Sequence, residues 1–184
     1  MPVATIPMLT VEDYRLLPEA GPRYQLIEGE LHMSPAPNWY HQVISVNIEF
    51  MLLKYLEANP IGKLLHAPFD VFLTEHDAYQ PDVIFVSNEN AGIFTNAGAE
   101  GAPDFVVEIL SPSTAHLDKR AKRLVYARTG VKEMWLVDPD AKLISIYHLQ
   151  ADAERPVATH GENDTFASVH FPGLSIRGAE VFKR

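Results

Sequence analysis

Apolar and polar residues follow two different periods along this 184-residue chain, which predicts both strands and helices. Runs of β-branched and aromatic residues bounded by turn residues indicate strands. We expect such strands at residues 64–73, 82–86, 105–110, 133–137, 143–147 and 165–169. The sequence around Glu28-Gly29-Glu30 is typical of a β-hairpin, with residues 24–27 and 31–33 as its arms. The run 105–110 is apolar on both faces, so it is expected to be a central strand.

Helical spacing of apolar residues marks two longer segments. We expect a helix over residues 38–59, buried on more than one side because two apolar stripes run along it. One stripe holds Ile44, Ile48, Met51, Leu52 and Tyr55, and the other holds Val43, Val46, Phe50 and Leu53. A second helix is expected from about Ser113 to Thr129, ended by Gly130, and a helical turn capped by Thr10 is expected near the N-terminus.

The order of these elements favours an α/β (α+β) fold. Its plan would be one central mixed sheet flanked by helices, with an extra N-terminal hairpin and C-terminal strands. We find no internal repeat and no domain-scale linker, so residues 1–184 are expected to form a single domain with its core at about residues 23–150. A composition of 47% hydrophobic and 21% charged residues is that of a compact soluble domain. Trp39 and Trp135 fit positions in its hydrophobic core.

Several classes of protein are excluded by what the chain lacks. It has no cysteine, which rules out disulfides, iron–sulfur clusters and thiol nucleophiles. No stretch approaches the roughly 18 apolar residues of a membrane span, and the N-terminus lacks the basic region of a secretory signal. There is no phosphate-binding Gly-x-x-x-x-Gly-Lys and no Gly-x-Ser-x-Gly elbow. We therefore expect a cytoplasmic protein with no membrane contact and no organic cofactor.

The net charge of −9 argues against a nonspecific nucleic-acid binder, but the charge is unevenly distributed. Residues 115–132 contain 6 basic residues and 1 acidic residue, whereas residues 1–114 contain 4 basic and 15 acidic residues. Such a basic segment is most simply a solvated helix face. Beside an acidic cleft it could instead supply a surface that faces phosphates. Both interpretations stay open at this point.

Two acidic residues lie at unusual places in the predicted strands. Glu108 is near the end of the run that is apolar on both faces, where an ionised carboxylate without a partner is costly. Asp82 follows Pro81 at the start of the preceding strand. Carboxylates on neighbouring strands are natural ligands of a hard divalent ion. Asp104 is on the same strand as Glu108 but about 13 Å away, too far to share one ion, so Asp82 is the better partner.

The helix that follows Glu108 carries a row of polar residues. Asp118, Lys122 and Tyr126 are spaced i, i+4, i+8, so they share one edge of the predicted helix. Lys122 is the cation best placed to reach over the two carboxylates. The simplest alternative is a surface pair between Asp118 and Lys122, which contributes only a few tenths of a kcal/mol.

These residues, together with the motifs around them, resemble a known family. The motifs are Glu28-Gly29-Glu30-Leu31, His41, Pro81-Asp82, residues 107–114, Asp118 with Lys122 and Tyr126, and residues 130–139. They are similar to the Uma-type family of "putative restriction endonucleases", formerly a domain of unknown function, in the PD-(D/E)XK nuclease superfamily. The resemblance covers roughly residues 10–175 and is most specific from Glu108 to Pro139.

The resemblance implies a four-stranded mixed core sheet and a Mg²⁺ (or Mn²⁺) site held by Asp82 and Glu108, helped by the carbonyl of Ile109. The metal would activate a water molecule for attack on a phosphodiester, and a lysine would orient or deprotonate that water. The lysine position of the E-x-K pattern is Leu110 in this chain. The resemblance implies that Lys122 supplies the lysine from the helix, so Asp82, Glu108 and Lys122 are the candidate catalytic residues.

Four further residues are candidates for auxiliary roles. Glu28 is either an additional acidic residue near the metal or a turn carboxylate beside Gly29. His41 either touches the site or a phosphate, or is a core histidine at the start of its helix. Asp118 and Tyr126 are candidates as neighbours of Lys122.

The leading hypothesis is a Mg²⁺-dependent endonuclease that cleaves DNA as a homodimer, because duplex cleavage requires two sites. A second hypothesis is a non-catalytic dimeric or partner-binding module on a nuclease fold, motivated by the net charge of −9 and by Leu110. A third is a phosphodiesterase that acts on RNA or on small nucleotides.

Overall fold

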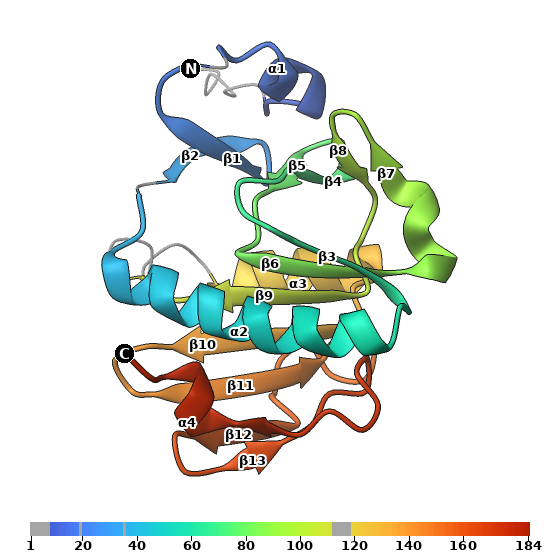
Figure 1. Ribbon diagram of the computed structural model, residues 1–184. Helices are drawn as coiled ribbons and strands as arrows, with labels where there is room; N and C mark the ends of the chain where they lie inside the picture. The colour runs from blue at the N-terminus through green and yellow to red at the C-terminus, as the bar shows by residue number, and fades with distance from the viewer. Residues whose placement is uncertain (1–7, 19, 35, 112–118) are drawn as a thin grey trace.

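A computed structural model describes residues 8–18, 20–34, 36–111 and 119–184 of the chain. These residues form two six-stranded sheets, a small two-stranded sheet and the helices that cover them (Figure 1). Residues 112–118 lie outside the described residues. The predicted start of the second helix at Ser113 and the candidate residue Asp118 therefore fall where the structure describes nothing.

The central sheet has the strand order β12-β11-β10-β9-β6-β3. Its strands are β3 (Gly62–His66), β6 (Val83–Ser87), β9 (Phe105–Ile109), β10 (Glu133–Asp138), β11 (Leu143–His148) and β12 (Ala158–Gly161). Strand β9 pairs antiparallel with β6 and parallel with β10, so the predicted mixed sheet is confirmed, with six strands where the resemblance implied four. The apolar run of β9 takes a middle position because its side chains can be buried on both faces.

A second six-stranded sheet, which we call the hairpin sheet, has the order β2-β1-β5-β4-β8-β7. Its strands are β1 (Arg23–Ile27), β2 (Glu30–Ser34), β4 (Val71–Thr74), β5 (Asp77–Tyr79), β7 (Phe94–Thr95) and β8 (Gly98–Glu100). The predicted hairpin is β1–β2, and it forms one end of this sheet (Figure 1).

The structure corrects two predictions that concern the hairpin sheet. The single strand expected over 64–73 is wrong, because β3 ends at His66 in the central sheet and β4 begins at Val71 in the hairpin sheet. Pro68, which has no N–H for a ladder, lies between them. The segment 88–103, for which the sequence predicts neither a helix nor a strand, contains the 3₁₀ helix η1 (Asn88–Ile93) and the short strands β7 and β8.

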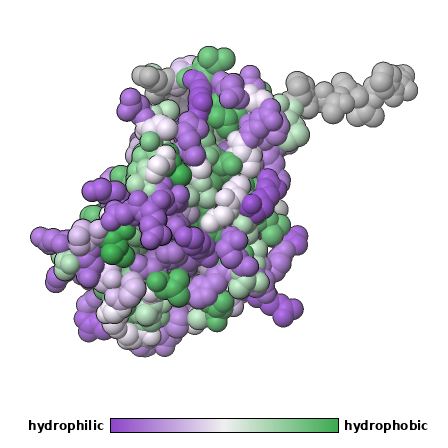
Figure 2. All heavy atoms as spheres, turned by 90° about the vertical axis from the view of Figure 1, so that its right-hand side faces the viewer, coloured by the Kyte–Doolittle hydropathy of each residue, from purple (hydrophilic) through white to green (hydrophobic). Residues whose placement is uncertain are grey.

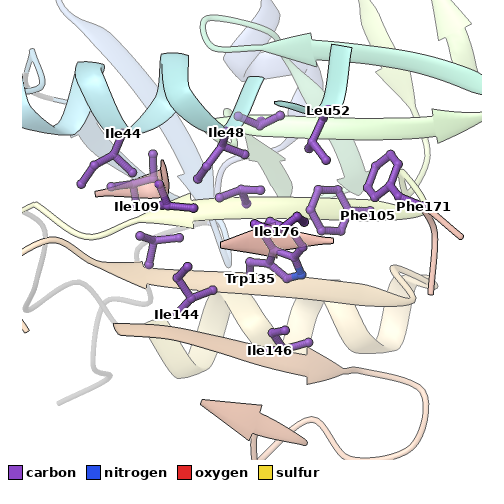
Figure 3. Close-up of a cluster of buried hydrophobic side chains, with 14 of the residues drawn as sticks. Ile44, Ile48, Leu52, Phe105, Ile109, Trp135, Ile144, Ile146, Phe171 and Ile176 are labelled. Atoms are coloured by element: carbon purple, nitrogen blue, oxygen red, sulfur yellow. The ribbon is translucent and has the colours of Figure 1, made fainter. Parts of the chain in front are cut away.

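Two helices cover the two faces of the central sheet. Helix α2 (Trp39–Ala58) is capped by Asn38, whose side chain accepts from the N–H of His41 at 2.9 Å. Apolar side chains of α2 pack on Phe105, Val107 and Ile109 of β9 (Figure 3). Val106, which points to the opposite face, packs with residues of α3 (Lys119–Thr129). The alternation of side chains along β9 therefore contributes to a separate hydrophobic cluster on each face of the central sheet.

The C-terminal segment adds a layer beside α2. It contains β13 (Thr165–Phe166), β14 (Ile176–Arg177) and α4 (Gly178–Val181), and Phe171, Ile176 and Val181 belong to the same core as α2. The strand expected over 165–169 is thus only two residues long. At the other end of the chain, α1 (Val11–Arg15) is capped by Thr10, as predicted.

The outer face of α2 differs from the prediction. Val46, Phe50 and Leu53 are 58%, 62% and 50% exposed, so the helix is not buried on the side of its second apolar stripe. Trp39, expected in the core, is 63% exposed, whereas Trp135 is buried as predicted. The described residues place the central sheet and α4 against α2 and leave this stripe uncovered. On the side of the molecule that Figure 2 shows, hydrophilic residues predominate and hydrophobic ones are scattered among them.

Candidate active site

A cavity of about 520 Å³ lies between the hairpin β1–β2, the first half of α2, the start of β6 and the end of β9. Charged and polar side chains from all of these elements line it, together with one from α3. They include Arg23, Gln25, His41, Asp82, Glu108 and Lys122. The structure therefore brings the three residues predicted to be catalytic, Asp82, Glu108 and Lys122, to one cavity.

The two carboxylates face each other across β6 and β9. The register pairs Val83 with Val107, and its continuation by one residue places Asp82 opposite Glu108 on the same face of the sheet. Asp82 Oδ2 accepts a hydrogen bond of 2.7 Å from the N–H of Ile109. The side chains of Asp82 and Glu108 are only 19% and 17% exposed. Two nearly buried carboxylates at one place need positive charge nearby.

Helix α3 supplies a cation and a hydroxyl to Glu108. Lys122 Nζ lies 2.5 Å from Glu108 Oε1, and the hydroxyl of Tyr126 donates to the same oxygen at 2.6 Å. The i, i+4 spacing on α3 puts Lys122 and Tyr126 on one edge of the helix, as the sequence predicted. Burial, followed by the charge of Glu108, raises the pKa of Tyr126 well above its usual range. Tyr126 is therefore a protonated donor at neutral pH.

His41 reaches the site from α2. Its Nε2 lies 3.4 Å from Asp82 Oδ1, and the ring is buried. Burial disfavours the charged ring, but the hydrogen bond and the charge of Asp82 outweigh it and raise the pKa of His41. The backbone of His41 also takes part in the helix cap at Asn38. His41 therefore belongs to the first turn of α2 and contacts Asp82, and its role at the site stays a prediction.

Glu28 is not among the residues that line the cavity. It lies at the turn of the hairpin with a φ of 50°, and its Oε1 is 3.9 Å from Nη1 of Arg128. Its backbone N–H donates to Asp77 Oδ1 at 2.9 Å. The structure therefore places Glu28 in a contact between the hairpin and the end of α3, away from Asp82 and Glu108.

Gln25 reaches the cavity instead, and sequence reasoning missed it. Gln25 and Ile27 are two residues apart on β1 and both line the cavity, as the alternation of side chains along a strand allows. That alternation was the signal available in the sequence. It does not say which of the two faces of β1 points to the cavity. Leu110 also lines the cavity, so the E-x-K lysine position supplies no donor there.

Over residues 120–132, the part of the basic segment whose side chains are described, the basic residues pair with acids and do not form a free phosphate-facing surface. Besides Lys122 with Glu108, four of these side chains contact acidic residues from other parts of the chain. These pairs are Arg120 with Glu154 at 2.7 Å, Arg123 with Glu154 at 3.6 Å, Arg128 with Asp77 at 3.2 Å and Lys132 with Asp104 at 2.6 Å. The local charge excess is thus largely balanced by the fold.

Comparisons with known proteins identify the relatives of this arrangement. The family model Uma2, described as "Putative restriction endonuclease", matches residues 11–179, so the predicted resemblance is confirmed. The fold is similar to a crystal structure of "a putative nuclease belonging to DUF820" from Anabaena variabilis ATCC 29413, with a TM-score of 0.78 and 21% identity over 95% of this chain and 97% of that chain. At this identity the similarity shows the fold alone. A search of curated proteins gave no match.

None of the helices in the described ranges combines the length and the apolar composition that a membrane crossing demands.

Proposed function

This chain belongs to the Uma2 family of "putative restriction endonucleases", and from that premise we propose that it is a Mg²⁺-dependent endonuclease that hydrolyses phosphodiester bonds of DNA. The observation that carries the proposal is the convergence of Asp82, Glu108 and Lys122 on one cavity of about 520 Å³. Acidic ligands beside a lysine are the groups that phosphodiester hydrolysis by a metal-activated water requires.

The oxygen donors at this cavity fit a hard divalent cation. Asp82 and Glu108 offer carboxylates, the ligands that Mg²⁺ and Mn²⁺ prefer. The described part of the chain contains no group of three or more His, Cys, Asp or Glu side chains that could hold a metal. Mg²⁺ is commonly bound by one or two carboxylates and keeps several waters, so two carboxylates beside a cavity are sufficient. When bound, the cation would lower the pKa of a water molecule and offset charge on the phosphate.

The side chains around the two carboxylates have complementary tasks. Lys122 holds a positive charge at the cavity, where it can orient a water molecule or offset the charge that develops on a phosphate. Tyr126 fixes Oε1 of Glu108, and the N–H of Ile109 fixes Oδ2 of Asp82. His41 contacts the other oxygen of Asp82. These contacts keep the carboxylates in place before a ligand arrives, which favours catalysis by preorganisation.

The test is a titration of Mg²⁺ and of Mn²⁺ into the wild type and Glu108→Gln. Thermal stability and cleavage of supercoiled and linear DNA are followed together. The wild type is expected to gain thermal stability with metal and to nick DNA, and Glu108→Gln to do neither. The matched control is Glu162→Gln, because Glu162 also pairs with a lysine, Lys142, at 2.8 Å but does not line the cavity. If Glu108→Gln binds metal and cleaves DNA like the wild type, the metal-binding role that we propose for Glu108 is wrong.

A non-catalytic binding module is a second candidate, and one observation favours it. Glu108 Oε1 already accepts from Lys122 and Tyr126, while Leu110 supplies no donor, as expected if the ion pair served only stability. This candidate predicts that Mg²⁺ and Mn²⁺ at millimolar concentration leave the thermal midpoint unchanged. It also predicts that no nucleic acid is cleaved in the titration.

A phosphodiesterase that acts on RNA or on small nucleotides would use the same carboxylates. The cavity volume of about 520 Å³ lies in the usual range of small-molecule sites. The metal titration is therefore repeated with single-stranded RNA and with dinucleotides. Cleavage of RNA or of dinucleotides without cleavage of DNA would show that these molecules, and not DNA, are the substrates.

We propose in addition that the protein forms a homodimer through the outer face of α2. Trp39, Val46, Phe50 and Leu53 are at least half exposed and lie on one side of the helix. Clustered exposed apolar side chains mark interaction surfaces. The face adjoins Gln42, which lines the cavity, so a second copy would stand beside the site. Light scattering should report a dimer for the wild type and a monomer for Phe50→Glu, and a monomeric wild type contradicts this proposal.

A further inference from the structure

Lys122 has a second hydrogen-bond acceptor, and it comes from the other sheet. Gln25 Oε1 lies 3.2 Å from Lys122 Nζ, although the two residues are 97 positions apart in the sequence. Gln25 belongs to β1 of the hairpin sheet, whereas Lys122 belongs to α3, which packs on the central sheet. This hydrogen bond therefore joins two walls of the cavity directly at the candidate lysine.

Three neighbours fix the orientation of the Gln25 amide. Its Oε1 also accepts from the backbone N–H of Gln80 at 3.1 Å, and its Nε2 donates to Ser34 Oγ at 2.9 Å. A rotation of the amide by half a turn would set Nε2 against two donors, Lys122 and the Gln80 N–H. Only one orientation satisfies all three contacts, and it keeps the oxygen directed at Lys122.

The surroundings of Lys122 stabilise its positive charge without relying on Glu108 alone. The ammonium group has three protons to donate, and Glu108 and Gln25 accept two of them. The ring of Tyr79 lies 5.2 Å from Nζ, within the range of a cation–π contact. Among the described residues, Gln25 is the one neutral side chain that accepts a hydrogen bond from Lys122.

We propose that Gln25 is a positioning residue that holds the Lys122 ammonium between its own oxygen and Glu108. Asp82 and Glu108 would hold a divalent cation, and this cation would compete with the ammonium of Lys122 for the Glu108 carboxylate. With Gln25 present, Lys122 would keep an acceptor when its contact with Glu108 weakens, and it would stay at the cavity. The effect on cleavage rests on the proposed nuclease function, whereas the effects on the lysine and on metal affinity do not.

Three variants separate this role from a merely structural one. Gln25→Met keeps the length of the side chain but removes the acceptor, and Gln25→Glu keeps an acceptor oxygen. The matched control is Gln150→Met, because Gln150 also makes two hydrogen bonds, to the carbonyls of Ala127 and Val131 at 3.0 Å, and does not line the cavity. Gln150→Met reports what the loss of a hydrogen-bonded side-chain amide outside the cavity does to the fold.

The experiment has three readouts, all on the 184-residue chain. Lysine ammonium NMR, with the Lys122 signal assigned by Lys122→Met, reports whether the protons of Nζ are held. Calorimetric titration with Mn²⁺ reports metal affinity, and steady-state cleavage of DNA separates kcat from KM. We expect Gln25→Met to lose the Lys122 signal at saturating Mg²⁺, where Glu108 no longer holds the lysine alone, to bind Mn²⁺ about tenfold more weakly and to lower kcat about tenfold, with KM within about twofold of the wild type. Gln25→Glu should restore most of each value, and Gln150→Met should change none.

The outcomes are distinguishable from those of the proposed function. An unchanged Lys122 signal and unchanged Mn²⁺ affinity in Gln25→Met would overturn the positioning role, whether or not the protein cleaves DNA. Equal losses in Gln25→Met and Gln25→Glu would also overturn it, because the acceptor oxygen would then be irrelevant. If the wild type cleaves no substrate, the nuclease proposal fails, and the NMR signal and metal affinity alone decide the role of Gln25.

Discussion

Two acid–lysine pairs flank strand β9, one at each end. Asp104, just before the strand, pairs with Lys132 at 2.6 Å, and Glu108, near its end, pairs with Lys122 at 2.5 Å. The residue types and distances are almost the same. The surroundings are not, because Glu108 and Lys122 line the 520 Å³ cavity and the other pair does not.

The other contacts of each acid explain the difference. Asp104 is 2% exposed, and besides Lys132 it accepts from the N–H of Ser87 at 2.8 Å and from the amide of Asn90 at 3.3 Å. The charge of Asp104 is thus balanced by Lys132, and the remaining hydrogen bonds of the carboxylate hold the backbone N–H of Ser87 and the side chain of Asn90 in place. Glu108 instead lies beside a second carboxylate on the wall of a cavity. An acid–lysine pair in a strand therefore indicates a site only where a second acid and open space accompany it.

The largest expected difference between the two pairs is the effect of replacing each lysine on DNA cleavage. Lys122→Met is expected to lower the turnover number for DNA cleavage by about 100- to 10 000-fold, the usual contribution of a group that orients or deprotonates the nucleophile. Lys132→Met should leave turnover per folded molecule unchanged, because Lys132 does not line the cavity. Single-turnover assays at saturating Mg²⁺ measure both variants. Similar losses in both would show that the two pairs are not functionally distinct.

For the stability of the fold we expect the opposite order: Asp104 should contribute more to the free energy of unfolding than Glu108. Asp104→Ala is expected to lower the free energy of unfolding by about 3 kcal/mol, because the Ser87 N–H and the Asn90 amide lose their acceptor along with the ion pair. Glu108→Ala should cost less than about 1.5 kcal/mol, since it also relieves repulsion from Asp82. Urea unfolding measures both values. A larger loss in Glu108→Ala than in Asp104→Ala would contradict this order.

Sequence reasoning succeeded where the signals are local. The apolar run of β9 identified a central strand, and an acidic residue inside it was conspicuous because an unpaired charge does not belong there. The i, i+4 spacing of Lys122 and Tyr126 placed both on one edge of α3, and both donate to Glu108 in the structure. The catalytic roles of these residues, the metal, the dimer and the cytoplasmic location stay predictions.

Sequence reasoning failed where the arrangement depends on contacts between distant segments. Strands β5, β7 and β8 have two or three residues each, too few to show a period, and β4 pairs with both β5 and β8 across loops. Glu28 was conspicuous beside Gly29, yet it contacts Arg128, while Gln25 is the hairpin residue that reaches the cavity. Which of the two faces the site depends on how the hairpin sheet packs on α3, and no local pattern encodes that packing.

The pH dependence of stability should sharpen the comparison further. Burial disfavours ionisation of Asp104, but the hydrogen bonds from Lys132 and from the Ser87 N–H outweigh it and lower the pKa of Asp104. An acid with a lowered pKa in the folded state stabilises the fold above its unfolded pKa of about 3.9, and this contribution is lost as the pH falls through the folded value. The difference in unfolding free energy between the wild type and Asp104→Asn should therefore be full near about pH 6 and shrink below about pH 4. Urea unfolding over this range measures it, and a difference that stays constant down to about pH 2 would exclude the ionised pair as its source.

The smallest effect is expected on the face of α3 that carries Arg120, where the exposed Arg120 and the buried Arg123 both contact Glu154. The side chains of Arg120 and Glu154 are 65% and 47% exposed, and exposed pairs contribute little to stability. Glu154→Gln should leave the thermal midpoint unchanged but make this face more positive. If DNA lies along α3 when it enters the cavity, Glu154→Gln should bind a labelled duplex more tightly at about 50 mM salt, and the gain should vanish near about 200 mM salt as counterions screen it. Fluorescence anisotropy measures both conditions. Unchanged affinity at low salt would mean that nucleic acid contacts the protein only at the cavity, so the acid–lysine pair of Glu108 and Lys122 alone would face the substrate.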